Sequence, residues 1–213
     1  YFYDQFSEPS EYNIPISWED DNTTQVDFSP EKVLKLLRDI NPNKAHGPDR
    51  IHGTVLKNCA HSLAYPLAAL FKTSYLTGHI PLEWKLANVV PVYKKGSKAS
   101  AENYRPISLT CLCMKLMEWI VREEVMRKCQ HLISPEQHGF LPGKSCTTQM
   151  VGFADSLASS INDAARTDVV YFDFAKAFDS VSHDILLYKL KSQFGIDGTL
   201  LKFIMNYLEG RKQ

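Results

Sequence analysis

The sequence predicts an α+β fold that is rich in helices, and three observations support this class. Apolar residues recur at helical spacing in five separate stretches of the chain. Two strand-like segments flank a polar turn between residues 86 and 109, and a hydrophobic run at residues 169–172 ends on Asp173. With 213 residues and 44% hydrophobic content, the chain is long enough to bury a substantial core.

We expect an acidic leader or linker at residues 1–28 and one folded domain at residues 29–213. Residues 1–31 carry eight acidic side chains and no lysine or arginine, whereas residues 32–213 carry 24 basic side chains against 16 acidic ones. The basic body suits a polyanionic partner. The chain does not begin with methionine, so we expect it to be a piece of a longer protein.

The sequence indicates an intracellular protein, nuclear or cytoplasmic, that is neither secreted nor bound to a membrane. No apolar run approaches the roughly 20 residues of a membrane-spanning helix, and the first residues do not resemble a secretion signal. The five cysteines form no C-x-x-C pair. We therefore interpret them as buried thiols and not as a disulfide framework.

The first helix is expected to begin after Ser29, which suits the N-cap, with Pro30 at the first helical position. Asn41 and Pro42 end it. Its apolar residues are Val33, Leu34, Leu37 and Ile40. A second, longer helix is expected over residues 54–77, interrupted near Pro66 and closed by Gly78. Its predicted buried face consists of Leu56, Ala60, Leu63, Leu67, Leu70, Phe71 and Tyr75.

A β-hairpin is predicted next, with strands at residues 86–93 and 104–109 joined by a polar turn at residues 94–103. Prolines inside both segments limit the hydrogen bonds that each strand can donate, which favours a projecting hairpin over a central strand pair. Further helices are predicted at residues 112–130 and 147–161, separated by a loop at residues 134–145. A last helix follows the cap Ser182, with Gly195 at its end. Its predicted inward residues are Leu186, Leu187, Leu190 and Phe194.

Residues 169–173 are predicted to form a buried strand that ends on a carboxylate. An ionised carboxylate in an apolar setting is costly unless a cation or hydrogen bonds compensate it, and the expected cation is a metal ion. The simpler alternative is that Asp173 caps the loop that follows. The residues after it favour the metal, because two aromatic residues, a lysine and Asp179 follow within six positions, which is more than a turn requires.

A cluster of basic residues on the hairpin is the second candidate site. It comprises Lys85, Lys94, Lys95, Lys98 and Arg105, with only Glu102 opposing it. Such runs are commonly just solvated surface. However, Lys94 and Arg105 lie at the ends of the two strands, where both can meet one phosphate group.

Residues 171–181 resemble the first catalytic motif of the reverse transcriptases of non-LTR (LINE-like) retrotransposons. Four other blocks occur in the same order as in that family: residues 43–51, 84–96, 103–110 and 137–145. The resemblance implies a right-hand polymerase of which this chain holds the fingers and the first part of the palm, up to but not including the Tyr-x-Asp-Asp motif. The implied reaction is RNA-directed DNA synthesis on a primer 3′-hydroxyl by two-metal nucleotidyl transfer during retrotransposition.

The resemblance also implies a role for individual residues. Asp173 is expected to bind the catalytic Mg²⁺ ions, with Mn²⁺ as an alternative, and the carbonyl oxygen of Phe174 to bind one of them. Phe178 is expected to exclude a ribose 2′-hydroxyl. The residues expected to hold the incoming deoxynucleoside triphosphate are Lys94, Arg105, Phe174, Lys176, Ala177 and Phe178. Those expected along the RNA template are Gln137, Gly139, Phe140 and Lys144.

Three positions depart from the family pattern: His46 replaces proline, Arg50 replaces glycine and Lys144 replaces arginine. The first two replacements leave the local turn geometry open. The third keeps the positive charge but loses the planar set of N–H donors that an arginine guanidinium group offers. The role of Asp179 is also open, since it can support Phe178 or merely begin a turn.

A further departure is that no adjacent pair of acidic residues follows Asp173 in the remaining 40 residues. One carboxylate cannot hold two ions, so we expect this chain alone to be inactive and to require the remainder of the polymerase chain, an RNA template and a DNA primer. Two alternatives remain. One is a catalytically dead nucleic-acid-binding or scaffolding remnant of a retroelement. The other is a metal-independent structural domain, in which Lys94, Arg105 and Asp173 point away from one another.

Overall fold

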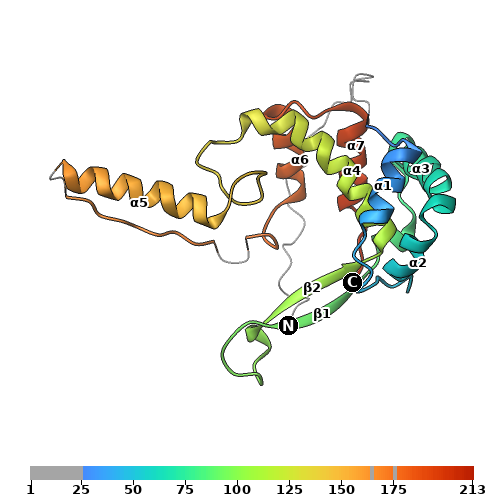
Figure 1. Cartoon of the computed structure of the whole chain (residues 1–213), viewed down its shortest axis with the longest axis horizontal. Helices are drawn as coiled ribbons and strands as arrows, with labels where there is room; N and C mark the ends of the chain where they lie inside the picture. The colour runs from blue at the N-terminus through green and yellow to red at the C-terminus, as the bar shows by residue number, and fades with distance from the viewer. Residues whose placement is uncertain (1–25, 164–165, 175–176) are drawn as a thin grey trace. The chain divides into compact units, whose positions relative to one another are not determined.

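A computed structural model describes residues 26–163, 166–174 and 177–213 of the chain (Figure 1). The chain divides into two compact units, and the smaller one spans Cys129–Ala177. The larger unit contains α1 (Pro30–Asp39), α2 (Gly53–Asn58), α3 (Ala60–Thr77), η2 (Leu82–Lys85), β1 (Ala87–Tyr93), η3 (Ala101–Asn103), β2 (Tyr104–Thr110), α4 (Leu112–Cys129, whose last residue begins the smaller unit), α6 (His183–Ser192) and α7 (Gly198–Leu208). The smaller unit contains η4 (Gln130–Leu132) and α5 (Cys146–Asn162). The predicted α+β class is confirmed: the described residues form helices and one two-stranded antiparallel sheet.

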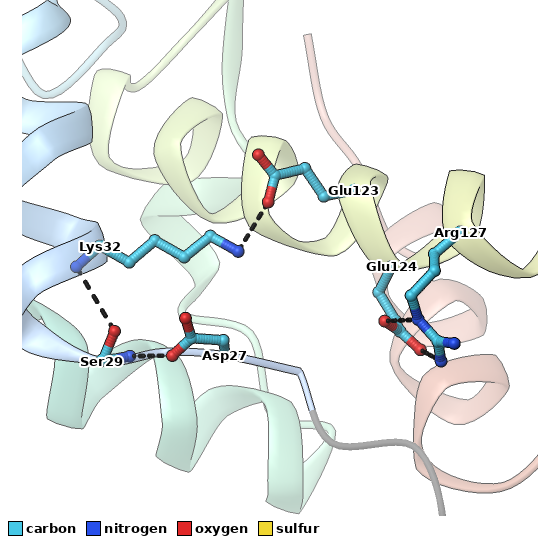
Figure 2. Close-up of polar contacts among 6 residues, drawn as sticks. All are labelled: Asp27, Ser29, Lys32, Glu123, Glu124 and Arg127. Carbon is cyan, nitrogen blue, oxygen red and sulfur yellow. Dashed lines mark hydrogen bonds and ion pairs between the residues drawn. The ribbon is translucent and has the colours of Figure 1, made fainter.

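The start of α1 agrees with its sequence signals. The Ser29 hydroxyl accepts a hydrogen bond from the Lys32 amide at 3.4 Å, and Pro30 is the first helical residue. The Asp27 carboxylate in turn accepts one from the Ser29 amide at 2.9 Å, and this bond lowers the pKa of Asp27. Figure 2 shows these contacts together with an ion pair of 2.6 Å between Lys32 and Glu123, which joins α1 to α4.

The core of the larger unit is formed by helix faces with apolar spacing. Val33 and Leu37 of α1 are fully buried, and α1 packs along α3. Besides Cys111, which lies between β2 and α4, the other large side chains that are almost wholly buried come from α3, α4, α7 and the turn before α7. They are Phe71, Met114, Met117, Ile120, Ile196, Leu200, Leu201 and Phe203. Each such side chain contributes about 1.5–3 kcal/mol of transfer free energy, so this helical cluster provides the base from which the hairpin extends.

The second predicted helix differs from the observed one in where it breaks. The chain forms two helices separated at Cys59, and α3 continues through Pro66. An internal proline costs a helix about 3 kcal/mol, and the burial of Ala64, Ala68 and Phe71 around it offsets that cost. Leu70 was predicted to be buried but is exposed. The predicted stop at Gly78 is confirmed by its left-handed φ of 70°.

The last predicted helix is confirmed as α6, and a further helix follows it. The Ser182 hydroxyl accepts a hydrogen bond from the Ile185 amide, and Gly195 has a left-handed φ of 63° beyond the helix end. Of the four residues predicted to face inward, Leu187 is buried and the other three are partly buried. Helix α7 was not predicted from the sequence. Its Tyr207 hydroxyl donates a hydrogen bond to Glu118 of α4 at 2.7 Å. Burial raises the pKa of the Glu118 carboxyl group.

The prediction that all five cysteines are buried was partly wrong. Cys111, Cys113 and Cys129 are buried, whereas Cys59 and Cys146 are exposed. Cys59 lies at the break between two helices and Cys146 starts α5, so neither belongs to a packed helix face. Burial raises the pKa of Cys111 to about 11 and that of Cys113 to about 12, because it disfavours the thiolate.

Helix α5 carries its apolar residues on the surface. Its described side chains include none that is buried, although Met150, Phe153, Leu157 and Ile161 recur at helical spacing. The helix itself begins with a capping box between Ser145 and Thr148. Local capping therefore defines the start of this helix, while on its apolar face Met150 and Ile161 are exposed and Phe153 and Leu157 are only partly buried. No helix in the described ranges is both long and apolar enough to cross a membrane.

Gly47 lies in close contact with the backbone where β2 passes into α4. A Cβ atom at this position would lie 2.5 Å from the amide nitrogen of Cys111 and 2.6 Å from the carbonyl carbon of Thr110. These are backbone atoms between two regular elements, so they cannot move aside easily. Glycine at this position therefore allows the loop before α2 to support the end of the hairpin.

We predict that Gly47→Ala lowers the free energy of unfolding by about 1–3 kcal/mol, the range of overpacking substitutions, as measured by chemical denaturation. Gly152→Ala is the matched control, since a Cβ there meets nothing within 4 Å and alanine favours the helix interior. Equal stability of the Gly47→Ala variant and the wild type would contradict the observed contact.

Candidate nucleotide and template site

The hairpin is the best-defined part of the candidate site. Strands β1 and β2 pair antiparallel, with Val92 opposite Arg105 and Tyr93 opposite Tyr104. The Lys94 amide donates to the Asn103 carbonyl at 2.7 Å, which continues the pairing one residue further. The predicted strand limits are confirmed to within one residue.

The register places Lys94 and Arg105 on the same face of the hairpin. Residues directly opposite each other share a face, and side chains alternate along a strand, so Val92, Lys94 and Arg105 point the same way. Diagonal neighbours of this kind lie about 7 Å apart. Both cationic side chains are exposed, and neither has an ion pair or a side-chain hydrogen bond in the part of the chain that the structure describes. They are therefore available to an anionic group.

Contacts within the turn keep its shape. The Tyr93 hydroxyl donates to the Gly96 carbonyl at 2.5 Å, and the Tyr104 hydroxyl donates to the Lys98 carbonyl at 2.9 Å. The Lys98 ammonium lies 5.6 Å from the centre of the Tyr93 ring, within cation–π range. Lys98 is thus engaged on the face opposite to that of Lys94 and Arg105, so the basic cluster seen in the sequence does not act as a single surface.

The prediction of a buried strand at residues 169–173 was wrong. The described residues 166–174 have no regular secondary structure, and Phe172 and Phe174 are 92% and 86% exposed. A strand is stabilised by hydrogen bonds to a neighbouring strand, and the only strand ladder in the described residues joins β1 to β2. The part of the chain that the structure describes supplies no strand to pair with this hydrophobic run.

Asp173 is exposed, and its carboxylate accepts no hydrogen bond and forms no ion pair within the described ranges. In those ranges, no three His, Cys, Asp or Glu side chains come together as a metal-binding group. Mg²⁺ commonly takes one or two carboxylates and completes its shell with phosphate oxygens and water. A single unengaged carboxylate fits such a site in part, so further oxygen ligands are required.

The residues after Asp173 form a turn where they are described. Residues 177–180 adopt a turn conformation, and Phe178 is 78% exposed. Lys176 lies outside the described residues. Asp173, Phe174 and Ala177 belong to the smaller unit, whereas Phe178, Lys94 and Arg105 belong to the larger one. The grouping of these residues around one nucleotide therefore stays a prediction.

The predicted template residues occupy one loop before α5. The Gln137 side-chain amide donates to the Gly139 carbonyl at 3.2 Å, and the Lys144 ammonium contacts the Pro135 carbonyl. Phe140 has a left-handed φ of 64° and is 84% exposed. A non-glycine residue in this region is uncommon and costs about 1–3 kcal/mol, so the surrounding loop holds the ring outward against that cost.

Thr148 is an organising residue that the sequence analysis missed. Its hydroxyl oxygen accepts a hydrogen bond from the Ser145 amide at 2.9 Å and contacts His138 Nδ1 at 2.8 Å. The Thr148 amide donates to the Ser145 hydroxyl at 3.2 Å. The Ser-x-x-Thr spacing at the start of a helix was the available signal, since it differs only in its last residue from a common capping box. Thr148 thus links the loop to the helix that follows.

The chain is similar to known polymerases over most of its length. A model of the family described as reverse transcriptase (RNA-dependent DNA polymerase) matches residues 92–213, which is more than half of the chain. The chain is 26% identical over 85% of its length to the probable RNA-directed DNA polymerase from transposon BS of Drosophila melanogaster, and 24% identical over 98% to that from transposon X-element of the same organism. It is also 24% identical over 85% of its length to the RNA-directed DNA polymerase from mobile element jockey of Drosophila funebris. It spans about one fifth of the length of these relatives, 20%, 22% and 20% respectively.

We predict that Thr148→Val loosens the loop and the first turn of α5 by about 1 kcal/mol, the typical effect of losing a helix cap. Amide hydrogen exchange at Ser145 and Thr148 measures this, because both amides bond within the capping box. Thr147→Val is the control, since Thr147 is exposed and forms no side-chain hydrogen bond with any described residue. Equal exchange rates in the two variants would show that the cap does not hold the loop.

Proposed function

Because the chain belongs to the reverse transcriptase family, we propose that it forms the fingers and the first part of the palm of an RNA-directed DNA polymerase encoded by a non-LTR retrotransposon. The folded domain is assigned to residues 29–213. The partners are an RNA template, a DNA primer, deoxynucleoside triphosphates and the rest of the polymerase chain. Such a reaction takes place inside the cell, in the nucleus or the cytoplasm.

The observation that carries this proposal is the pairing of β1 with β2, which directs Lys94 and Arg105 to one exposed face. A triphosphate carries several negative charges, and Arg supplies a fork of N–H donors beside the point charge of Lys. Neither cation has to break an internal ion pair to reach a phosphate, since neither has one among the described residues. This face is therefore suited to receive the phosphate groups of an incoming nucleotide.

Asp173 is proposed to hold the divalent ions together with the carbonyl oxygen of Phe174. When bound, Mg²⁺ activates the primer 3′-oxygen and stabilises the charge on the leaving pyrophosphate. The Asp173 carboxylate is exposed and has no hydrogen bond or ion pair with any described residue, so it can meet an ion without first losing such a contact. In the same proposal, backbone amides near Lys176 and Ala177 bind phosphate and Phe178 contacts the sugar.

Gln137, Gly139, Phe140 and Lys144 are proposed to contact the RNA template. The outward ring of Phe140 can stack on a base, and base–aromatic stacking contributes about 1–3 kcal/mol per base. The loop also presents backbone groups held by the Gln137 and Lys144 side chains. A loop that presents an exposed aromatic ring suits contact with unpaired template bases.

We predict that Asp173→Asn abolishes primer extension by the polymerase chain that contains these residues and its later palm motifs. The rate should fall about a thousandfold, equivalent to about 4 kcal/mol, because a neutral amide is a poor ligand for Mg²⁺. Incorporation of one deoxynucleotide on an RNA template measures the effect, and Asp155→Asn, an exposed change in α5, is the control. Extension by the Asp173→Asn variant at the wild-type rate would refute the metal role, and an inactive wild type would support the catalytically dead remnant.

We predict that replacing both Lys94 and Arg105 by Met weakens triphosphate binding about thirtyfold, since each of the two charge-assisted contacts contributes roughly 1 kcal/mol at an exposed site. Binding of dTTP with Mg²⁺ to the 213-residue chain, in the presence of an RNA–DNA primer–template, measures this change. Lys95→Met, which also removes one exposed turn cation, should leave the affinity within twofold of wild type. Equal losses in the control and the double variant would indicate that only net charge matters, and the phosphate site would be rejected.

A further inference from the structure

We propose that Lys85 is a positioning residue, which fixes the base of the hairpin by holding the chain segment after α7 (residues 209–212). The consequence for nucleotide binding rests on the function proposed above for Lys94 and Arg105. The contact itself can be measured independently of that function. The sequence groups Lys85 with the other cations of the basic cluster, but the structure gives its ammonium group a partner within the chain.

Three hydrogen bonds join the two segments, although they lie more than 120 positions apart in the sequence. The Lys85 ammonium donates to the Glu209 carbonyl at 2.9 Å, across a separation of 124 residues. The Lys85 carbonyl accepts from the Lys212 amide at 3.1 Å, and the Ala87 amide donates to the Lys212 carbonyl at 2.9 Å. The two backbone bonds together make Leu86 and Lys212 an isolated parallel bridge. Residues 209–212 therefore pair with the outer edge of β1 where the hairpin begins.

The hairpin register explains why this edge is open at its base and closed further along. Since Lys94 and Asn103 form a hydrogen-bonded pair, the alternation of an antiparallel ladder directs the Ala87 amide outward, away from β2. The same alternation directs position 91 outward, but Pro91 has no N–H to offer. A neighbouring segment can thus bond to β1 at Ala87 and cannot extend its pairing beyond Pro91.

The segment that holds the hairpin is itself tied to the helical core. Glu209 caps the end of α7, where carbonyl groups give the helix a partial negative charge that favours an ammonium group. The Arg211 guanidinium donates to the Tyr207 carbonyl at 3.3 Å and lies 4.5 Å from the centre of the Tyr207 ring. Tyr207 is hydrogen-bonded to Glu118 of α4. The core therefore supports β1 through residues 209–212, as it supports β2 through Gly47.

Support at the base matters because the cations lie at the far end. A strand of seven residues is about 23 Å long at 3.3 Å per residue, so a tilt of about 10° at the base moves its other end by about 4 Å. A shift of that size exceeds the tolerance of a hydrogen bond. Lys85 thus acts on the triphosphate through the position of Lys94 and Arg105 and does not touch it.

The first test of this proposal is amide hydrogen exchange at Ala87 and Lys212 in the 213-residue chain. Lys85→Met keeps the length of the side chain but removes its donor, and it should speed exchange at both amides about tenfold, while Lys85→Arg restores protection because arginine also donates to a carbonyl. Lys95→Met is the matched control and should leave both rates unchanged. Unchanged exchange in Lys85→Met, or failure of Lys85→Arg to restore it, would overturn the proposal.

The second test separates positioning from simple destabilisation. Lys85→Met should weaken binding of dTTP with Mg²⁺ and primer–template about threefold to tenfold, with the thermal unfolding midpoint within about 2 °C of wild type. Faster exchange with unchanged dTTP affinity would overturn the positioning role, provided that the Lys94 and Arg105 double variant does lose affinity. If that double variant binds dTTP as the wild type does, the proposed function fails, and amide exchange alone still decides whether Lys85 holds the hairpin base.

Discussion

The antiparallel register of β1 and β2 is the constraint on which the candidate site depends. Side chains alternate between the two faces, so a shift of one residue in the pairing would move Arg105 to the face opposite Lys94. The paired prolines, Pro91 and Pro106, fall at a position where the ladder exchanges no hydrogen bonds, so neither leaves a donor missing between the strands. At these two positions the outward edge of each strand also has no N–H group to donate, which discourages pairing with another chain.

The hairpin is positioned by contacts at its base and shaped by contacts at its turn. Gly47 lies against the end of β2, and residues 209–212 pair with the start of β1. At the other end, the hydroxyl groups of Tyr93 and Tyr104 bond to carbonyls of the turn. Apart from the Lys85 ammonium group and Lys98, these contacts involve the backbone or a tyrosine, and the side chains of Lys94 and Arg105 form none of them. That separation leaves Lys94 and Arg105 available for a ligand.

In the smaller unit, local hydrogen bonds define the helix, and burial of side chains contributes less than it does in the larger unit. Its helix α5 is defined at its start by a capping box, yet none of its described side chains is buried. The neighbouring hydrophobic run, which includes Phe172 and Phe174, is also exposed and unpaired as a strand. Apolar surface of this extent on one segment normally meets another surface. In the proposed polymerase, the rest of the palm is the partner that we expect to meet it.

Local signals in the sequence were sufficient for most of the elements, whereas the roles of the candidate residues followed from the family resemblance and stay predictions. Ser29 with Pro30, Ser182 and Gly78 marked helix ends correctly, because capping involves only neighbouring residues. The hairpin followed from two apolar segments around a polar turn. Only the tertiary structure showed that Lys85 bonds to Glu209, that Lys98 lies over a ring, and that residues 169–173 do not form a buried strand. Each of these depends on which distant backbone or ring is near, and a periodic pattern carries no information about that.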